Sequence, residues 1–233
     1  DAPVGYLSSF LHYCKINNLD FNQIWNSKDT EIYHFIGKDI LYFHALFWPA
    51  VLNDAEYRTP TSLCVHGFLT VNGEKMSKSR GTFITARSYL ESQLNPEYFR
   101  YYIASKLTSK IEDIDLSFSD FIARINSELV GKYINIASRS AGFISKKFAG
   151  KLASEIVDMT LVDRVLSIKD EVANLYTSRE FSKAIKLIMA MIDEINQYVD
   201  TVKPWILAKE DGQENELHQV CTNLINVFKI FAV

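Results

Sequence analysis

A short stretch in the first half of the chain concentrates positive charge between two glycines. Lys75, Lys78 and Arg80 place three cations within six residues, and Gly73 and Gly81 flank them. Such groups can neutralise the charge that develops on a polyphosphate during phosphoryl or adenylyl transfer. The stretch lacks the G-x-x-x-x-G-K-[ST] pattern, so it is not a P-loop. By residue type alone, an ordinary solvated basic turn is the simpler explanation.

The residues before this loop have the composition of a strand. Residues 63–71 are rich in β-formers and are followed by Asn72-Gly73, a strong turn signal, so we expect extended structure leading into the loop. Residues 33–37 predict another strand. From Asp39 onward the apolar spacing becomes helical, with a kink expected at Pro49. Strand followed by helix indicates an α/β sheet domain.

The second half of the chain has the apolar spacing of amphipathic helices. Asn95-Pro96-Glu97 predicts a helix start, and residues 112–115 predict a junction rather than an element. Apolar stripes begin at Phe118, Leu161, Phe181 and Leu217, and Thr177 and Glu180 have capping-box spacing before the third. Four such helices predict a helical bundle. We therefore divide the chain near residue 117, into domains 1–117 and 118–233.

Composition limits the class of protein. Apolar residues make up 48% and charged residues 23% of the chain, which fits a soluble globular protein, and no apolar run reaches the ~18 residues of a membrane span. Cys14, Cys64 and Cys221 have no short pairing, which argues against a disulfide framework or a C-x-x-C metal knuckle. The net charge of −3 gives no overall basic field, so any RNA binding must be local. We expect a cytoplasmic protein with no membrane partner. Because the chain starts without methionine, we also expect a fragment of a longer protein.

The literal string of the basic loop is more specific than its residue types. Lys75-Met76-Ser77-Lys78-Ser79 resembles the second signature of the class I aminoacyl-tRNA synthetases. Further segments resemble the methionyl-tRNA synthetases, namely residues 1–6, 35–44, 65–73, 47–50 and 135–139. The leucine, isoleucine and valine enzymes differ from this chain at residues 35–44. The resemblance covers essentially the whole chain and points to the carboxy-terminal part of such an enzyme.

The resemblance implies a fold and an activity. The fold is α/β followed by all-α: the second half of a Rossmann-type nucleotide-binding domain, then a helical-bundle anticodon-binding domain. The activity is ATP-dependent activation of methionine to methionyl-adenylate, with Mg²⁺, and transfer to tRNA(Met). The chain contains neither the family's first signature nor its zinc-carrying insertion, so we expect no zinc site in it and no activity from it alone.

Within that resemblance, two lysines are the catalytic candidates and seven residues the nucleotide-binding ones. Lys78 would contact the phosphates in the adenylation transition state, and Lys75 would support it. A glycine at position 37 permits close approach of a ligand to the backbone, and Asp39 can accept from ribose hydroxyls. The nucleotide-binding set implied by the family is Gly37, Asp39, His66, Gly67, Met76, Ser77 and Ser79.

The methionine site implied by the family suits the chemistry of a thioether. That group is apolar and polarizable and accepts only weak hydrogen bonds, so it needs aromatic and aliphatic walls with one or two polar groups. Tyr6 and His44 would lie near the sulfur; without the resemblance, both are ordinary core residues. The implied lining residues are Ala2, Pro3, Tyr6, Ile40, Phe43 and His44.

The implied anticodon contacts lie in the helical half. Asn135 and Arg139 are four residues apart and so share one helix face, and Trp205 follows Pro204 at a predicted helix break. Sequence-specific RNA readers stack bases on aromatic planes and read base edges with polar groups. By residue type alone, a solvated polar face and a packing tryptophan explain these three residues equally well.

Two other functions stay open from sequence. One is a different class I synthetase, and the other is a non-catalytic tRNA-binding module derived from such an enzyme.

The basic loop generates a direct test. In the intact enzyme, Lys78→Ala should lower the rate of methionyl-adenylate formation far more than it weakens methionine binding, because the ammonium group acts on the phosphates. Methionine-dependent pyrophosphate exchange measures the first quantity and equilibrium binding the second. An unchanged exchange turnover would contradict the assignment.

Overall fold

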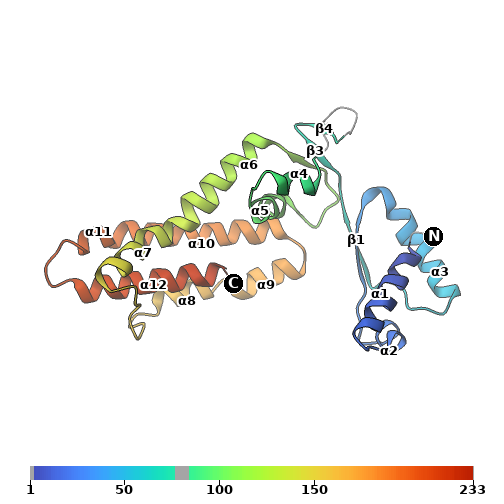
Figure 1. Ribbon diagram of the computed structural model, residues 1–233, viewed down its shortest axis with the longest axis horizontal. Coiled ribbons are helices and arrows are strands. Elements are labelled where there is room, and N and C mark those ends of the chain that lie inside the picture. The colour runs from blue at the N-terminus through green and yellow to red at the C-terminus, as the bar shows by residue number, and fades with distance from the viewer. Residues whose placement is uncertain (1–2, 77–83, 233) are drawn as a thin grey trace. The chain divides into compact units, whose positions relative to one another are not determined.

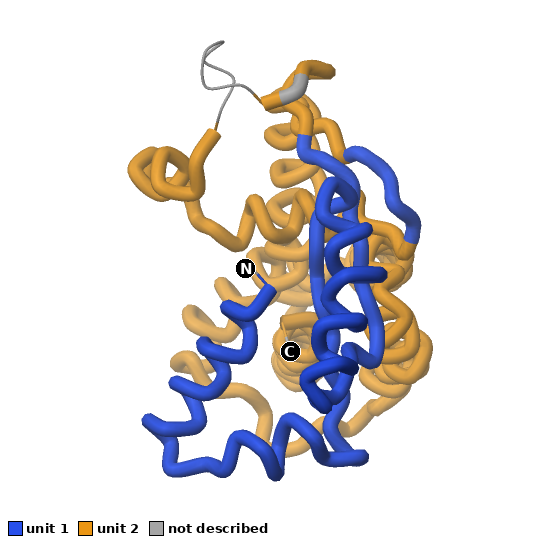
Figure 2. The backbone as a smooth tube through the Cα atoms, turned by 90° about the vertical axis from the view of Figure 1, so that its right-hand side faces the viewer, with its two compact units in different colours: residues 1–69, 110–113 blue, residues 70–109, 114–233 orange. Residues whose placement is uncertain are grey.

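A computed structural model of the chain describes residues 3–76 and 84–232 (Figure 1). The chain forms two compact units, coloured separately in Figure 2. The first unit takes in Asp1–Leu69 and Lys110–Asp113, and the second takes in Thr70–Ser109 and Ile114–Val233. Mixed α/β structure in the first unit and mostly helical structure in the second match the order of fold classes expected from sequence.

Two parallel strands organise the first unit. Strand β1 (Tyr33–Gly37) pairs with β2 (Ser62–His66) in a continuous five-residue register that ends with Gly37 opposite His66. Parallel strands require a crossover connection, and here a helical run between Lys38 and Asp54 supplies it. Helices α1 (Val4–Ile16) and α2 (Phe21–Trp25) precede β1.

The crossover run changes its helical pitch along its length. It begins as a 3₁₀ turn, η1 (Lys38–Ile40), becomes a π-helix, η2 (Phe43–Phe47), and ends as α3 (Trp48–Asp54). Pro49 is the second residue of α3, and in a regular α-helix its ring would clash with the carbonyl four residues before it. The wider π-turns directly before Pro49 relieve that crowding, so the disturbance expected at Pro49 takes the form of a π segment.

The predicted strand 63–71 is in fact two strands. β2 ends at His66, and β3 (Leu69–Val71) begins a second sheet whose strand order is β4-β3-β5, with β4 at Glu74–Lys75 and β5 at Ile114–Leu116. The junction predicted at residues 112–115 is therefore wrong for Ile114 and Asp115, which begin β5. Strand β5 has only three residues, too few to show a periodic pattern in the sequence. Its partner β3 lies more than 40 residues earlier, so the pairing leaves no local signal in the sequence either.

The turn expected at Asn72-Gly73 is confirmed. Both residues have positive φ angles, 49° and 79°, as the central residues of a type I′ hairpin turn require. Asp115 on the neighbouring strand holds this turn, because one of its carboxylate oxygens accepts from Gly73 N and from Thr70 Oγ1, each at 2.7 Å. Asn72 N also donates to Leu116 O at 3.1 Å. Strand β5 thus holds the hairpin that leads into the basic loop through these hydrogen bonds.

Helices make up most of the second unit. Their bounds are α4 (Ala86–Glu91), α5 (Pro96–Lys106), α6 (Phe118–Arg124), the π-helix η3 (Ile125–Ile134), α7 (Asn135–Lys147), α8 (Thr160–Leu166), α9 (Lys169–Thr177), α10 (Phe181–Val202), α11 (Pro204–Leu207) and α12 (Glu214–Ala232). Figure 1 shows α7, α10 and α12 running alongside one another, and contacts join α12 to α7 and α8, and α10 to α5, α7 and α9. Their shared core includes Ile136, Ile192, Ile195, Val199, Leu224 and Val227.

Two helix boundaries test the predictions from sequence. The start at Asn95 is confirmed, since its side chain accepts from Glu97 N at 3.0 Å and Pro96 is the first helical residue. The capping box at Thr177 and Glu180 is wrong. Thr177 is the last residue of α9, and its hydroxyl donates back to Ala173 O at 2.9 Å. Within residues 3–76 and 84–232, no helix has both the length and the apolar character that crossing a membrane demands.

The hold of Asp115 on the hairpin gives a prediction about stability. Asp115→Ala should lower the free energy of unfolding by about 1–2 kcal/mol, because two donors lose their acceptor, whereas Asp115→Asn keeps an acceptor oxygen and should cost less. Urea unfolding at pH 7 measures both changes. Equal losses in the two variants would contradict this account.

The same contact has a pH signature. Hydrogen bonds from Gly73 N and then Thr70 hold the pKa of Asp115 below its ordinary value of 3.8. The stabilisation by the carboxylate is therefore complete above pH 3.8 and is lost as the pH falls through the lowered pKa of the folded state. The free energy of unfolding of the parent protein should therefore approach that of Asp115→Asn as the pH falls from 3.8 through the lowered pKa of Asp115.

Candidate functional site

The carboxyl ends of the two parallel strands bring three predicted nucleotide-binding residues together. A side chain at Gly37 would meet Asp39 Oδ1 at 2.7 Å and His66 Cε1 at 3.7 Å, so these two side chains close over the glycine. His66 Nδ1 lies 2.8 Å from Gly67 O; since a carbonyl only accepts, Nδ1 carries the proton and Nε2 is left as an acceptor. Ligands of open α/β sheets bind outside the carboxyl ends of strands, and this edge offers them two acceptor side chains, Asp39 and His66.

Gly67 has a structural reason of its own for lacking a side chain. A Cβ atom there would collide with the backbone of Glu112 and with the carboxylate of Asp113. Asp113 Oδ1 accepts from Phe68 N and from Lys38 Nζ, each at 2.7 Å, and these bonds lower the pKa of Asp113. The close approach of residues 110–113 therefore explains Gly67, and its contact with a nucleotide stays a prediction.

Tyr6 and His44, predicted to face the methionine sulfur, are in direct contact. The Tyr6 hydroxyl lies 2.9 Å from His44 Nε2, and His44 Nδ1 lies 3.0 Å from the carbonyl oxygen of Ile40. Because the Ile40 carbonyl can only accept, the proton of neutral His44 is on Nδ1, and Nε2 accepts from Tyr6. Tyr6 comes from α1 and His44 from the π-helix η2, where the widened turns re-aim side chains.

Two further residues, His34 and Trp48, join this cluster and are absent from the site expected from sequence. Trp48 Nε1 donates to His34 Nε2 at 3.2 Å, and the His34 ring lies 4.6 Å from that of Tyr6 and 5.6 Å from that of His44, centroid to centroid. Burial lowers the pKa of His34, and the charge of His44 lowers it further. A histidine at the inward position of a strand, between exposed Tyr33 and Phe35, is the signal that could have found it.

The remaining predicted lining residues lie outside this cluster of rings. Pro3 caps the start of α1, and Ala2 falls outside the described residues. Phe43 is 57% exposed, and its ring contact is with Phe47 at 5.8 Å rather than with Tyr6 or His44. The structure thus brings together Tyr6, His44 and the Ile40 backbone, but not Phe43.

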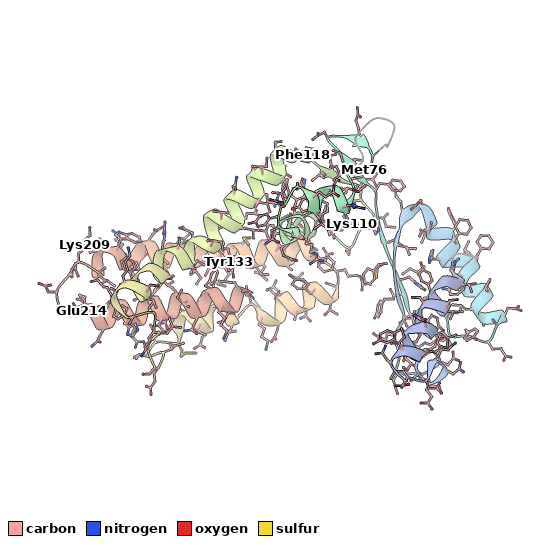
Figure 3. The ribbon with its side chains drawn as sticks, viewed as in Figure 1. Met76, Lys110, Phe118, Tyr133, Lys209 and Glu214 are labelled. Atoms are coloured by element: carbon pink, nitrogen blue, oxygen red, sulfur yellow. The ribbon has the colours of Figure 1, made fainter. Side chains whose placement is uncertain are left out.

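Of the two lysines predicted to be catalytic, the structure describes only the backbone of Lys75. The backbone of Lys75 belongs to β4, and Met76 follows it at the end of the hairpin (Figure 3). Ser77, Lys78 and Ser79 lie outside the described residues, so their positions stay predictions. Among residues 3–76 and 84–232, no three His, Cys, Asp or Glu side chains are grouped to hold a metal ion.

In the second unit, the three predicted anticodon residues gather on neighbouring helices. Arg139 pairs with Asp200 at 2.6 Å, and its guanidinium lies 5.6 Å from the centre of the Trp205 ring. Asn135, one turn before Arg139 on α7, donates to Asn196 Oδ1 at 3.4 Å. The predicted break before Trp205 is confirmed: Lys203 adopts a left-handed conformation between α10 and α11, and Trp205 is 37% exposed. The patch offers an aromatic plane, a cation and an amide.

Comparison with known sequences identifies the family of the chain. The family described as "tRNA synthetases class I (M)" matches residues 1–141. The methionine–tRNA ligase of Chromobacterium violaceum is 57% identical over the whole chain, and that of Neisseria meningitidis serogroup B is 58% identical over 98% of it. The chain spans only 34% and 33% of the lengths of these relatives.

Solved structures give the same result. A methionyl-tRNA synthetase of Mycobacterium tuberculosis in complex with methionyl-adenylate superposes with a TM-score of 0.75 at 27% identity, covering 88% of this chain and 41% of that one. The ligand-free form of the same enzyme gives a TM-score of 0.72 at 25% identity. A family match over more than half of the chain and relatives of such high identity lead to one conclusion: the chain belongs to the methionyl-tRNA synthetase family of the class I tRNA synthetases.

Proposed function

We propose that the chain is part of a methionine–tRNA ligase, which activates methionine with ATP and transfers it to tRNA(Met). The observation that carries this proposal is the contact of the Tyr6 hydroxyl with His44 among the rings of His34 and Trp48. A thioether needs polarizable aromatic walls and a weak polar contact, with no charge nearby. The cluster supplies both: the rings of Tyr6, His34 and Trp48 form the aromatic walls, and the Tyr6 hydroxyl is the polar contact.

The adenylate would lie beside this cluster, at the carboxyl ends of β1 and β2. In the reaction, a carboxylate oxygen of methionine bonds to the α-phosphorus of ATP while the bond to the β-phosphate breaks and pyrophosphate leaves. Asp39 would accept from the ribose, and Gly37, His66 and Gly67 would border the nucleotide. Lys78 and Lys75 would neutralise the phosphates, and Mg²⁺ would enter bound to them.

The first unit has the features of half a nucleotide-binding domain. A two-stranded sheet is marginal by itself, and large apolar side chains of β1 and its crossover are exposed, namely Phe35, Tyr42, Phe43, Leu46 and Phe47. In our proposal, the remainder of a Rossmann-type sheet comes from the part of the longer protein that this chain does not include. That part would also complete the active site. A cytoplasmic location belongs to the same proposal, because Cys14, Cys64 and Cys221 are all unpaired.

The helices of the second unit would form the anticodon-binding domain. Trp205 would stack on an anticodon base, and Arg139 and Asn135 would read base edges. Arg139 is restrained by Asp200 and by the Trp205 ring, so its guanidinium is already placed before RNA arrives. This restraint supports a binding surface rather than a mobile solvated face.

The proposal predicts a difference between the whole protein and this chain. The full-length protein should catalyse pyrophosphate exchange stimulated by methionine and not by leucine, isoleucine or valine, whereas residues 1–233 alone should give none, because adenylation needs groups from both halves of the domain. Stimulation by another amino acid would indicate a different synthetase. Absence of exchange in the full-length protein would indicate a non-catalytic tRNA-binding module.

The anticodon patch gives an independent prediction. Trp205→Ala in the full-length protein should raise the KM for tRNA(Met) by about 5- to 150-fold, because one base loses a stacking partner worth about 1–3 kcal/mol. Trp205→Phe keeps an aromatic plane and should have a smaller effect. Methionine-dependent exchange, which needs no tRNA, should be unchanged in both variants. Unaltered aminoacylation of initiator and elongator tRNAs by Trp205→Ala would contradict the anticodon assignment.

A further inference from the structure

His34 lies at the centre of the ring cluster of the first unit. It points inward from β1, is 7% exposed, and accepts a hydrogen bond from Trp48 Nε1 at 3.2 Å. Its ring also packs at 4.6 Å against that of Tyr6. One side chain on a strand therefore touches both aromatic residues that face the proposed thioether site.

The hydrogen bond fixes the protonation state of His34. An indole N–H can only donate, so His34 Nε2 must carry a lone pair, and the ring proton of the neutral form is on Nδ1. Burial and the neighbouring His44 both lower the pKa of His34, which keeps it in this form at neutral pH. A protonated ring would have no acceptor for Trp48, and the buried indole N–H would lose its partner.

We infer that His34 is a positioning residue for the methionine side chain: it anchors Trp48 through the indole hydrogen bond, backs the ring of Tyr6, and so sets the preference for a thioether over a hydrocarbon of the same shape. The inference rests on the proposed function. Tyr6 is held a second time by His44, so the hydroxyl nearest the sulfur is fixed at its tip by one histidine and along its ring by the other. Sites supported in this way from rigid strands hold their geometry closely.

Variants of the full-length protein separate this role from ordinary core packing. His34→Leu removes the acceptor and keeps an apolar side chain, whereas His34→Gln presents a carbonyl oxygen at about the reach of Nε2. His12→Leu, at an exposed histidine of α1, is the matched control. For each variant we would measure the KM for methionine, the KM for ATP and the ratio of kcat/KM for methionine to that for norleucine, in which a methylene replaces the sulfur.

We expect His34→Leu to raise the KM for methionine about tenfold and to lower the methionine-to-norleucine ratio by a similar factor, because an indole N–H is left unpaired beside the site. The KM for ATP should change less than twofold. His34→Gln should recover most of both losses, and His12→Leu should match the parent. In a Trp48→Phe background, which lacks the donor, His34→Leu should add much less to the KM for methionine.

The outcomes are distinct. An unchanged KM and an unchanged norleucine ratio in His34→Leu would overturn the inference and leave the proposed function intact. Equal rises in KM for methionine and ATP, without recovery by His34→Gln, would also overturn it, since they are the result of a purely structural role. Failure of the parent protein to show methionine-dependent exchange would instead overturn the proposed function.

Discussion

The parallel pairing of β1 with β2 is the constraint on which the first unit depends. Because the strands run in the same direction, the chain must cross from the end of one to the start of the other, and the helical run 38–54 makes that crossing. The same pairing sets Gly37 opposite His66 at the carboxyl ends of the strands. The crossover then brings Trp48 and His44 into contact with His34 on the inward face of β1. One topological requirement thus builds both the strand edge at Gly37 and His66 and the ring cluster.

The second unit uses one helix for two purposes. On α7, Ile136 is buried in the core shared with α10 and α12, and Ile144 is buried against Leu217 and Cys221 of α12. Asn135 and Arg139 each precede a buried position by one residue, and their polar groups bond to Asn196 and Asp200 of α10. A helical offset of about 100° per residue separates the packing face from the polar face. Because the buried face fixes the rotation of α7, it also fixes the direction in which Asn135 and Arg139 point.

The structural features predicted correctly from sequence are those set by one or two neighbouring residues. The hairpin at Asn72-Gly73, the cap at Asn95 and the break before Trp205 each depend on the backbone preferences of one or two residues. Resemblance named Tyr6 and His44 as neighbours of the methionine sulfur, and the structure shows these two side chains in contact, although the methionine, nucleotide and anticodon sites all stay predictions. Residues defined by distant partners were not predicted: Asp115 needs the hairpin 42 residues away, and His34 needs an indole in the crossover. The capping box predicted at Thr177 was wrong because a threonine hydroxyl, which can cap the start of a helix, can equally donate to a backbone carbonyl at the end of one, here that of Ala173.

The tie between Phe68 and Asp113 has a consequence for the evolution of the chain. The segment from Leu69 to Glu112 leaves and returns at two points joined by a 2.7 Å hydrogen bond, and Gly67 lacks a side chain where the returning residues Glu112 and Asp113 approach it. Such an excursion behaves as an insertion whose ends are already closed. Lengthening it changes the closure entropy only slowly, since each doubling of loop length costs about 0.6 kcal/mol. The hydrogen bond between Phe68 N and Asp113 therefore holds the two ends of this segment together next to the end of β2.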